Sequence, residues 1–255
     1  MQNSLTKCKG LNKSLLQLIA VLAMVIDHTA LFAPIPSLYY IMHFIGRATI
    51  IIMCYFVAEG YHKTQNIGKY IIRMAIFAAV SQIPYYLYSR WGAIPQNFNT
   101  LIVDVFHRRN VIFSLFLGLS LLTVLKSDYN LVIKVIAMFA ALRLGKYSDW
   151  GYWAILWIVG FGMFYGSKKK QMIWLVAILL MRLAYTAIGP VVGIYKTHTL
   201  MYSTLYNWLT GFGGFIALFL LPFYNGERGN MPKWTWYVFY PVHLLVIVAI
   251  IAILF

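Results

Sequence analysis

Two adjacent ionisable residues, Asp27 and His28, stand inside a long apolar run. A charge near the centre of a membrane-spanning helix costs about 2.5 to 3.5 kcal/mol even on the gentler insertion scales. Neighbours on a helix point about 100° apart, so each side chain needs a partner from another helix or water in a cavity. An imidazole so placed is a candidate general base or transient acyl carrier, with a carboxylate orienting the site. The alternative is a hydrogen-bonded pair that only holds this helix to its neighbours.

Three further charged positions follow in the N-terminal half. Arg47 lies early in the next apolar run, on the side of the membrane where Asp27 is expected. It is predicted either to pair with Asp27, which lowers the insertion cost of both, or to hold a phosphate or carboxylate of a ligand. Glu59 closes this run and is either an exposed helix-end acid beside Lys63 or part of a site. Arg73 is expected to pair with Glu59 or to face a phosphate.

Two candidates lie in the C-terminal half. Either Ser148 or Asp149 would make an ordinary N-cap for a helix that starts at Trp150, which is the structural alternative to a role in a site. His243 follows Pro241 in the last apolar run. A proline inside a helix frees a carbonyl one turn earlier and usually kinks the helix. His243 is therefore either a second member of the site or a packing residue.

The elements that position these residues are predicted to be membrane-spanning helices. Hydrophobic residues make up 62% of the chain and charged residues 11%, whereas a soluble domain carries about 25% charged residues. The net charge of +15 would suggest nucleic acid in a soluble protein. Here the basic residues lie mostly in short connections between apolar runs, which is typical of the positive-inside rule. We expect membrane lipid, and no nucleic acid, among the partners.

The predicted fold class is an all-α polytopic integral membrane protein with about nine transmembrane helices, within a range of eight to ten. A cytoplasmic tail of residues 1–13 is expected to precede a single transmembrane helical domain of residues 14–255. Basic residues favour the side of this tail, which predicts a cytoplasmic N-terminus and an external C-terminus. The nine runs cover residues 15–32, 38–60, 70–88, 111–125, 131–144, 150–165, 172–188, 201–223 and 234–255.

Three smaller expectations complete the outline. The connection 90–110 mixes apolar and polar residues and is expected to be a loop, an interfacial helix or a re-entrant segment. Cys8 in the tail and Cys54 deep in an apolar run are expected to be free thiols. No two of the six histidines stand three or four residues apart, so no metal site is predicted.

Several short motifs follow one another in a defined order. In the N-terminal half they are Ile19, Ala20, Met24, Asp27 and His28, then Gly46 and Arg47, then Glu59, Gly60, Tyr61 and Thr64, then Lys69, Tyr70 and Arg73, then Ser81, Gln82 and Pro84. Further on they are Asn110, Val111, Phe113, Ser114, Leu115 and Gly118, then Ser148, Asp149 and Gly151, then Tyr224, Asn225, Gly226, Arg228 and Gly229, then Phe239, Tyr240, Pro241, His243 and Leu244. This order resembles the TraX family, over about residues 14 to 246. That family is named for the membrane protein that acetylates the N-terminus of conjugative pilin.

The TraX family is similar in outline to larger transmembrane acyltransferases, including heparan glucosamine acetyltransferase. The resemblance implies an enzyme that moves an acetyl group from cytoplasmic acetyl-coenzyme A (acetyl-CoA) to an amine or hydroxyl acceptor at or across the membrane. The acceptor would be a protein such as pilin, a glycan or a lipid, and the membrane the bacterial cytoplasmic (inner) membrane. The catalytic residues would be Asp27, His28 and His243. The residues expected to bind the coenzyme are Arg47, Glu59, Lys63, Lys69, Tyr70, Arg73, Asp149 and Tyr240.

Two other functions use the same residues. A proton- or ion-coupled membrane transporter would employ Asp27, His28 and Arg47 as a relay, although the chain is short, has few charges and shows no internal repeat. An assembly factor for a secretion or pilus system would leave these residues as packing devices. The enzyme requires a base, a path for the coenzyme and a path for the acceptor. The last two depend on how the helices are arranged.

Overall fold

The structure is a computed structural model that describes residues 10–91, 94, 97–192, 205–206, 208–232 and 234–254. The backbone in these ranges is helical and forms no β-strand. The predictions for Cys8 and for the start of the run 201–223 lie outside the described residues. The helices are α1 (Lys13–Thr29), α2 (Pro36–Lys63), α3 (Ile67–Val80), α4 (Gln82–Ser89), α5 (Phe98–His107), α6 (Val111–Lys126), α7 (Leu131–Gly145), α8 (Gly151–Met163), α9 (Lys168–Val192), α11 (Phe215–Leu220) and α12 (Thr235–Leu254), with the short 3-10 segments η1 (Ala30–Phe32), η2 (Phe212–Gly214) and η3 (Leu221–Phe223).

Five described segments are long and apolar enough to cross a membrane. They are Lys13–Phe32, Pro36–Lys63, Ile67–Ser89, Lys168–Ala187 and Thr235–Leu254. Three shorter apolar helical segments are Val111–Lys126, Gly151–Met163 and Trp208–Phe223. The remaining predicted run, 131–144, forms α7, most of whose side chains are exposed. The prediction of an all-α polytopic membrane protein is therefore confirmed.

Asparagine begins several of these helices. The side-chain oxygens of Asn12, Asn66, Asn110 and Asn130 accept hydrogen bonds from backbone N–H groups in the first turns of α1, α3, α6 and α7. Such caps satisfy N–H groups that have no partner inside the helix. Pro36 begins α2 instead, at a position where its missing N–H is no loss. Polar residues between the apolar runs thus set where each helix starts.

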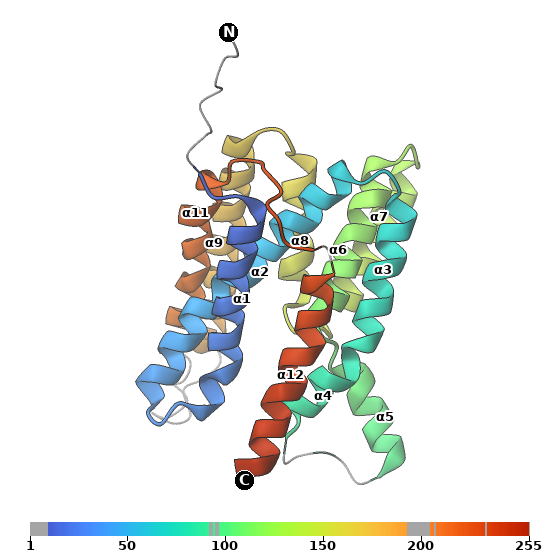
Figure 1. The fold of residues 1–255 in the computed structure, drawn as a ribbon. Coiled ribbons are helices and arrows are strands. Elements are labelled where there is room, and N and C mark those ends of the chain that lie inside the picture. Colours follow the sequence, from blue (N-terminus) through green and yellow to red (C-terminus); the bar gives the residue numbers. More distant parts are fainter. Residues whose placement is uncertain are drawn as a thin grey trace.

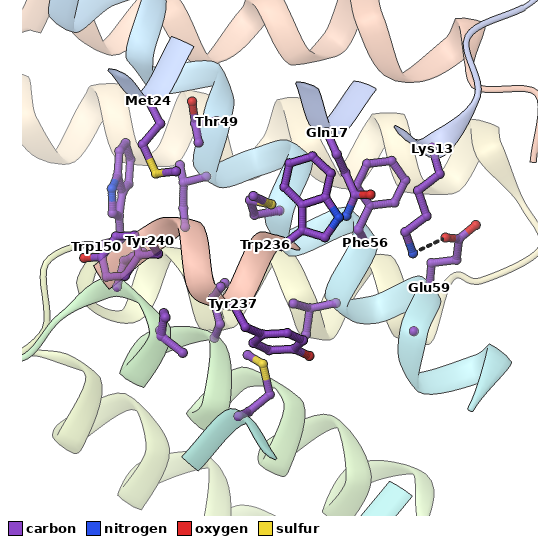
Figure 2. A pocket seen from close by; sticks show the side chains of 18 of the residues that line it. Lys13, Gln17, Met24, Thr49, Phe56, Glu59, Trp150, Trp236, Tyr237 and Tyr240 are labelled. Atoms are coloured by element: carbon purple, nitrogen blue, oxygen red, sulfur yellow. Dashed lines mark hydrogen bonds and ion pairs between the residues drawn. The ribbon is translucent and has the colours of Figure 1, made fainter. Parts of the chain in front are cut away.

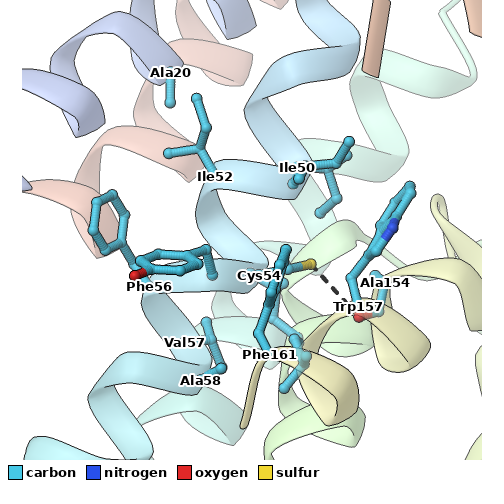
Figure 3. Packing of buried hydrophobic residues seen from close by; sticks show 14 of the residues in the cluster. Ala20, Ile50, Ile52, Cys54, Phe56, Val57, Ala58, Ala154, Trp157 and Phe161 are labelled. Carbon is cyan, nitrogen blue, oxygen red and sulfur yellow. Dashed lines mark hydrogen bonds between the residues drawn. The ribbon is translucent and has the colours of Figure 1, made fainter. Parts of the chain in front are cut away.

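The long helix α2 crosses the bundle diagonally and contacts α1, α6 and α8 (Figure 1). The start of α1 and the end of α12 lie at opposite ends of the bundle (Figure 1). Figure 3 shows the core between α2 and α8, where Ile52, Cys54, Trp157 and Phe161 are buried. Cys54 is a free, buried thiol that donates to the Ala154 carbonyl oxygen at 3.5 Å.

Several predicted boundaries differ from the structure by up to four residues, and one predicted run is divided. The run 70–88 is not one helix, because the chain breaks at Ser81 between α3 and α4. The helix expected to end near residue 188 continues to Val192 in α9. Ser81 is a small polar residue, and α9 contains Pro190 near its end. Residues of both kinds weaken the backbone hydrogen bonds of a helix, but they do not by themselves decide whether the helix ends.

The connection 90–110 contains the helix α5, so of the three alternatives the helix describes its residues 98–107. Two parallel hydrogen bonds join the Arg90 guanidinium to Asp104, at 2.6 and 2.7 Å, and the Tyr86 hydroxyl donates to the same carboxylate at 3.1 Å. The hydrogen bonds from Arg90 hold the pKa of Asp104 below its usual value. This network ties α5 to α4, and α5 exposes Phe98 and Phe106, as an interfacial helix does.

Candidate active site

A long cavity runs through the bundle from the end at which α1 begins. We call it the Lys13 cavity; its volume is about 430 Å³. Lys13 and Glu59 lie at one end of the view in Figure 2, and Trp150 and Tyr240 at the other. Its walls between them are mainly apolar and aromatic. The cavity has a charged mouth and an uncharged middle section lined by Met53, Phe56, Val57, Met74, Trp236 and Tyr237.

A second cavity opens from the opposite side of the same region. We call it the Arg47 cavity; its volume is about 540 Å³. It is lined by charged and aromatic side chains of α2, α4, α8 and α9, among them His43, Arg47 and Arg182. Both cavities share the lining residues Asp27, His28, Asp149 and Trp150. Two compartments therefore meet at the ionisable pair of α1.

His28 of α1 and His243 of α12 are hydrogen-bonded, although they are 215 residues apart in sequence. His28 Nδ1 lies 2.7 Å from His243 Nε2, and the two rings stack with centroids 4.9 Å apart. Tyr88 of α4 fixes His28 from another side: its hydroxyl donates to the His28 carbonyl oxygen at 3.0 Å, and the rings make an edge contact. Pro241 lies inside α12, two residues before His243. Three helices thus hold one imidazole in place.

The hydrogen bonds assign the tautomer of both rings. His243 Nδ1 lies 3.0 Å from the Phe239 carbonyl oxygen, which accepts but cannot donate. His243 therefore carries its proton on Nδ1, and its Nε2 is an acceptor when the ring is neutral. The 2.7 Å contact then requires the proton of His28 to be on Nδ1. This leaves the Nε2 lone pair of His28 free, on a ring that lines both cavities.

Asp27 finds its partner on α2 rather than on α1. Its Oδ1 lies 2.7 Å from Nδ1 of His43, and 4.0 Å from Nη1 of Arg47. The predicted pairing with Arg47 is thus present only at the outer limit of an ion pair. Helices α1 and α2 approach so closely here that a Cβ added to Gly46 would overlap the Asp27 side chain. The absence of a side chain at Gly46 allows the carboxylate to lie between the helices.

Glu59 is buried at the mouth of the Lys13 cavity. Its carboxylate accepts from Lys13 Nζ at 3.0 Å, from Lys63 Nζ at 2.8 Å and from the Tyr224 hydroxyl at 2.7 Å. The alternative of an exposed helix-end acid is wrong, because the polar segment that follows η3 folds back over the start of α1 and covers Glu59. Two lysines share one carboxylate, so the mouth keeps an excess of positive charge.

Arg73 and Arg228 add to this positive charge. The guanidinium of Arg73 lies over the rings of Tyr70 and Tyr237, at 5.2 and 5.3 Å from their centroids, and its Nε donates to the Tyr237 hydroxyl at 3.2 Å. The Arg228 carbonyl oxygen accepts from Ser14 at 3.1 Å, which holds that segment against α1. Both arginines line the cavity. The mouth therefore suits an anion with a flat ring system.

The remaining predicted residues divide between the two cavities. Asp149 lines both, and its side chain is accessible there. The N-cap prediction is wrong: α8 begins at Gly151, with Trp150 at the cap position and no side-chain cap bond. Lys69 lines neither cavity. The predicted coenzyme contacts that line the Lys13 cavity are Glu59, Lys63, Tyr70, Arg73, Asp149 and Tyr240, whereas Arg47 lines the other.

The sequence model described as TraX protein matches residues 12–251, nearly the whole chain. The chain belongs to the TraX family. Within this family, the protein is similar to the "Probable fimbrial assembly protein FimC, serogroup H1" of Dichelobacter nodosus, with 29% identity over 236 residues. The alignment covers 90% of this chain and 91% of that relative. No solved structure matches this TraX-family protein significantly.

Several site residues of this TraX-family protein were not predicted, and two of them, His43 and Arg182, left a signal in the sequence. His43 stands four residues before Arg47, so both lie on one face of α2, and this spacing was the available signal. Arg182 interrupts the apolar run of α9 and could have been noted for that reason alone. Among the residues that the structure describes, no group of three or more His, Cys, Asp or Glu side chains is arranged to hold a metal ion.

Proposed function

We propose that this TraX-family protein is a membrane-embedded acyltransferase that moves an acetyl group from acetyl-CoA to an amine or hydroxyl acceptor. The observation that carries the proposal is the position of His28, where a cavity with a basic mouth meets a second cavity that opens on the other side. An enzyme that joins a donor from one side to an acceptor from the other needs this arrangement. A packing role for His28 does not.

The Lys13 cavity suits the donor in shape and charge. A coenzyme A thioester has an anionic nucleotide at one end and a slender uncharged arm that ends in the acyl group. The mouth offers Lys63, Arg73 and Arg228 for phosphates and aromatic faces for a base. Lys13 and His28 are 15 residues apart on α1, which is a distance of about 22 Å along the helix at 1.5 Å per residue. This depth requires a long, thin substrate.

The free Nε2 of His28 supplies the chemistry. As a nucleophile it forms an N–C bond with the acetyl carbonyl carbon while the C–S bond breaks and coenzyme A leaves as the thiolate, which takes up a proton. The acceptor then attacks the acetyl-imidazole, its N–H or O–H proton is released, and His28 is regenerated. As a general base, Nε2 instead removes the acceptor proton during direct transfer. The first route predicts ping-pong kinetics and the second a ternary complex.

The acceptor is proposed to approach through the Arg47 cavity. The name of the Dichelobacter nodosus relative concerns fimbrial assembly, which makes a fimbrial or pilin subunit one candidate. A glycan or a lipid with an amine or hydroxyl group is another. With the donor at the mouth formed by the N-terminal basic residues, the positive-inside rule puts acetyl-CoA in the cytoplasm and the acceptor on the far side.

Coenzyme A binding tests the donor site directly. We expect coenzyme A to raise the melting temperature of the purified full chain in detergent, and radiolabelled acetyl-CoA to acetylate the protein or a membrane acceptor. Replacing the exposed Arg228 with Gln should weaken coenzyme A binding about tenfold, because a charge-assisted hydrogen bond is lost. Lys69→Gln removes an equally exposed cation outside both cavities and should bind as the wild type does. The transporter would be favoured if coenzyme A did not stabilise the chain and acetyl-CoA labelled neither the chain nor a membrane acceptor.

The tautomer assignment predicts different effects for two substitutions of His243. His243→Ala leaves His28 Nδ1–H without an acceptor and should lower acetyl transfer about tenfold or more. His243→Gln keeps an amide oxygen that accepts the same hydrogen bond, so it should recover most of that loss. Transfer is measured as label moved from radiolabelled acetyl-CoA to non-coenzyme material in membrane vesicles. Equal losses in both variants would show that His243 does not orient His28.

A further inference from the structure

An arginine without a carboxylate partner lies inside an apolar helix of this protein. Arg182 belongs to Lys168–Ala187, one of the five segments able to cross a membrane. The chain has only six Asp and Glu residues, and all of them lie in the described ranges. None forms an ion pair with Arg182 in the part of the chain that the structure describes. An unpaired cation at such a position is energetically unfavourable unless an anion joins it.

A second guanidinium lies on the same indole ring as Arg182. The Arg182 guanidinium is 5.2 Å from the centroid of a Trp150 ring, and that of Arg47 is 5.3 Å from it. Both side chains line the Arg47 cavity, and Lys146 does so as well. Arg47 Nε is buried and has no protein hydrogen-bond partner among the described residues. Two like charges are thus brought together over one ring, beside a buried Arg47 donor that has no partner among the described residues.

The first turn of α8 faces the same cavity. Trp150 stands at its cap position without a side-chain hydrogen bond, and Tyr152 and Trp153 of the first turn line the cavity. Tyr185, one turn after Arg182 on α9, contacts the rings of both residues. The Gly151 N–H donates to the Ser148 carbonyl oxygen at 2.9 Å, and the positive end of the helix dipole favours anions at such a position. The helix end and the two arginines therefore lie around one space.

The acids in this cavity offset its cations only in part: Asp27 and Asp149 both interact with Arg47, and neither forms an ion pair with Arg182 among the described residues. Asp27 is hydrogen-bonded to His43, and its distance to Arg47 is 4.0 Å. Asp149 lines the cavity on the side that it shares with the Lys13 cavity. The cavity thus keeps three cationic side chains against two carboxylates, one of which is already shared with a histidine.

We propose that Arg47 and Arg182, together with the first turn of α8, bind an anionic group of the acceptor. The acceptor of the proposed acetyl transfer would then be a molecule that carries a carboxylate or a phosphate as well as its reactive amine or hydroxyl. The anionic group is held against Trp150, and the reactive group points toward His28, which lines the same cavity. Arg182 is a binding residue in this assignment. The inference rests on the proposed function in one respect: that the molecule bound at this site is the acceptor of the acetyl group.

Small anions test the site without requiring any acetyl transfer. The purified full chain is melted in low-salt detergent buffer with glycylglycine, with glycylglycinamide, in which an amide replaces the carboxylate, or with inorganic phosphate. We expect glycylglycine, phosphate or both to raise the melting temperature, and glycylglycinamide to have no effect. Arg182→Gln should weaken the effective anion about tenfold or more. Stabilisation by glycylglycine alone indicates a carboxylate-bearing acceptor, and stabilisation by phosphate alone a phosphate-bearing one.

Matched variants separate this site from the basic mouth. Arg143→Gln removes an exposed arginine of α7 that contacts only Tyr147, and it should bind the anions as the wild type does. Lys63→Gln should keep the response to glycylglycine, since Lys63 lies at the other mouth, and any phosphate response that it loses belongs to that mouth. The inference is overturned if neither anion binds the wild type, or if Arg182→Gln binds normally. Coenzyme A binding by the same variants reports on the proposed function separately. If Arg182→Gln does not fold, Arg182→Lys, which keeps the charge but loses the planar fork, should show a smaller weakening.

Discussion

Replacing His28 with Gln is expected to lower acetyl transfer by about 10²- to 10⁴-fold, the range that general acid–base catalysis contributes. The imidazole is the ring that both cavities share, and Nε2 is its free nitrogen. Coenzyme A affinity should change little, because the basic mouth lies about 22 Å away along α1. Radiolabelled transfer in membrane vesicles and thermal stabilisation by coenzyme A measure the two effects separately.

A histidine at a distance from the site provides the control for this substitution. His107 lies on the exposed α5 and bonds only to a backbone carbonyl of its own helix. His107→Gln should transfer acetyl groups at the wild-type rate. If His28→Gln were as active as His107→Gln, His28 would have no catalytic role and the site would have to be sought elsewhere. A variant that binds coenzyme A and retains no acetyl label would instead support the acetyl-imidazole route.

Replacing Gly46 with Ala is expected to affect both stability and activity. The added Cβ overlaps the Asp27 side chain close to its own backbone, so α1 and α2 must move apart. Overpacking of this kind costs about 1 to 3 kcal/mol. The movement also pulls Asp27 from His43 and shifts His28, and a displacement of about 1 Å in a catalytic group can reduce the rate about 10²-fold. Thermal melting measures the loss of stability, and transfer of labelled acetyl groups measures the loss of activity.

Gly68 is the matched position for this test. It lies exposed in the first turn of α3, and an added Cβ would make only an ordinary contact with Asn66 at 3.5 Å. Gly68→Ala should leave activity unchanged and stability unchanged or slightly higher, because alanine favours helix. A Gly46→Ala variant as stable and active as Gly68→Ala would mean that the close approach of α1 and α2 is not needed for the site.

The sequence by itself determined that the chain lies in a membrane and that it forms helices. A chain with long apolar runs and few charges must satisfy its backbone inside helices, whatever their arrangement. The asparagines that cap α1, α3, α6 and α7 stand where the runs begin, so most boundaries could be predicted. Asp27 and His28 could be singled out because ionisable residues are expensive in an apolar run. These inferences use only local sequence.

Only the tertiary structure decided which side chains meet. Lipid-facing and buried faces of a membrane helix are both apolar, so periodicity does not show which face of α2 or α9 turns inward. Asp27 was expected beside Arg47 but bonds to His43, because the contact at Gly46 brings that turn of α2 closest. The convergence of Arg47 and Arg182 on Trp150 joins residues of three segments far apart in sequence. Contacts of this kind follow from side-chain packing between helices, which residue types and their spacing along one chain do not specify.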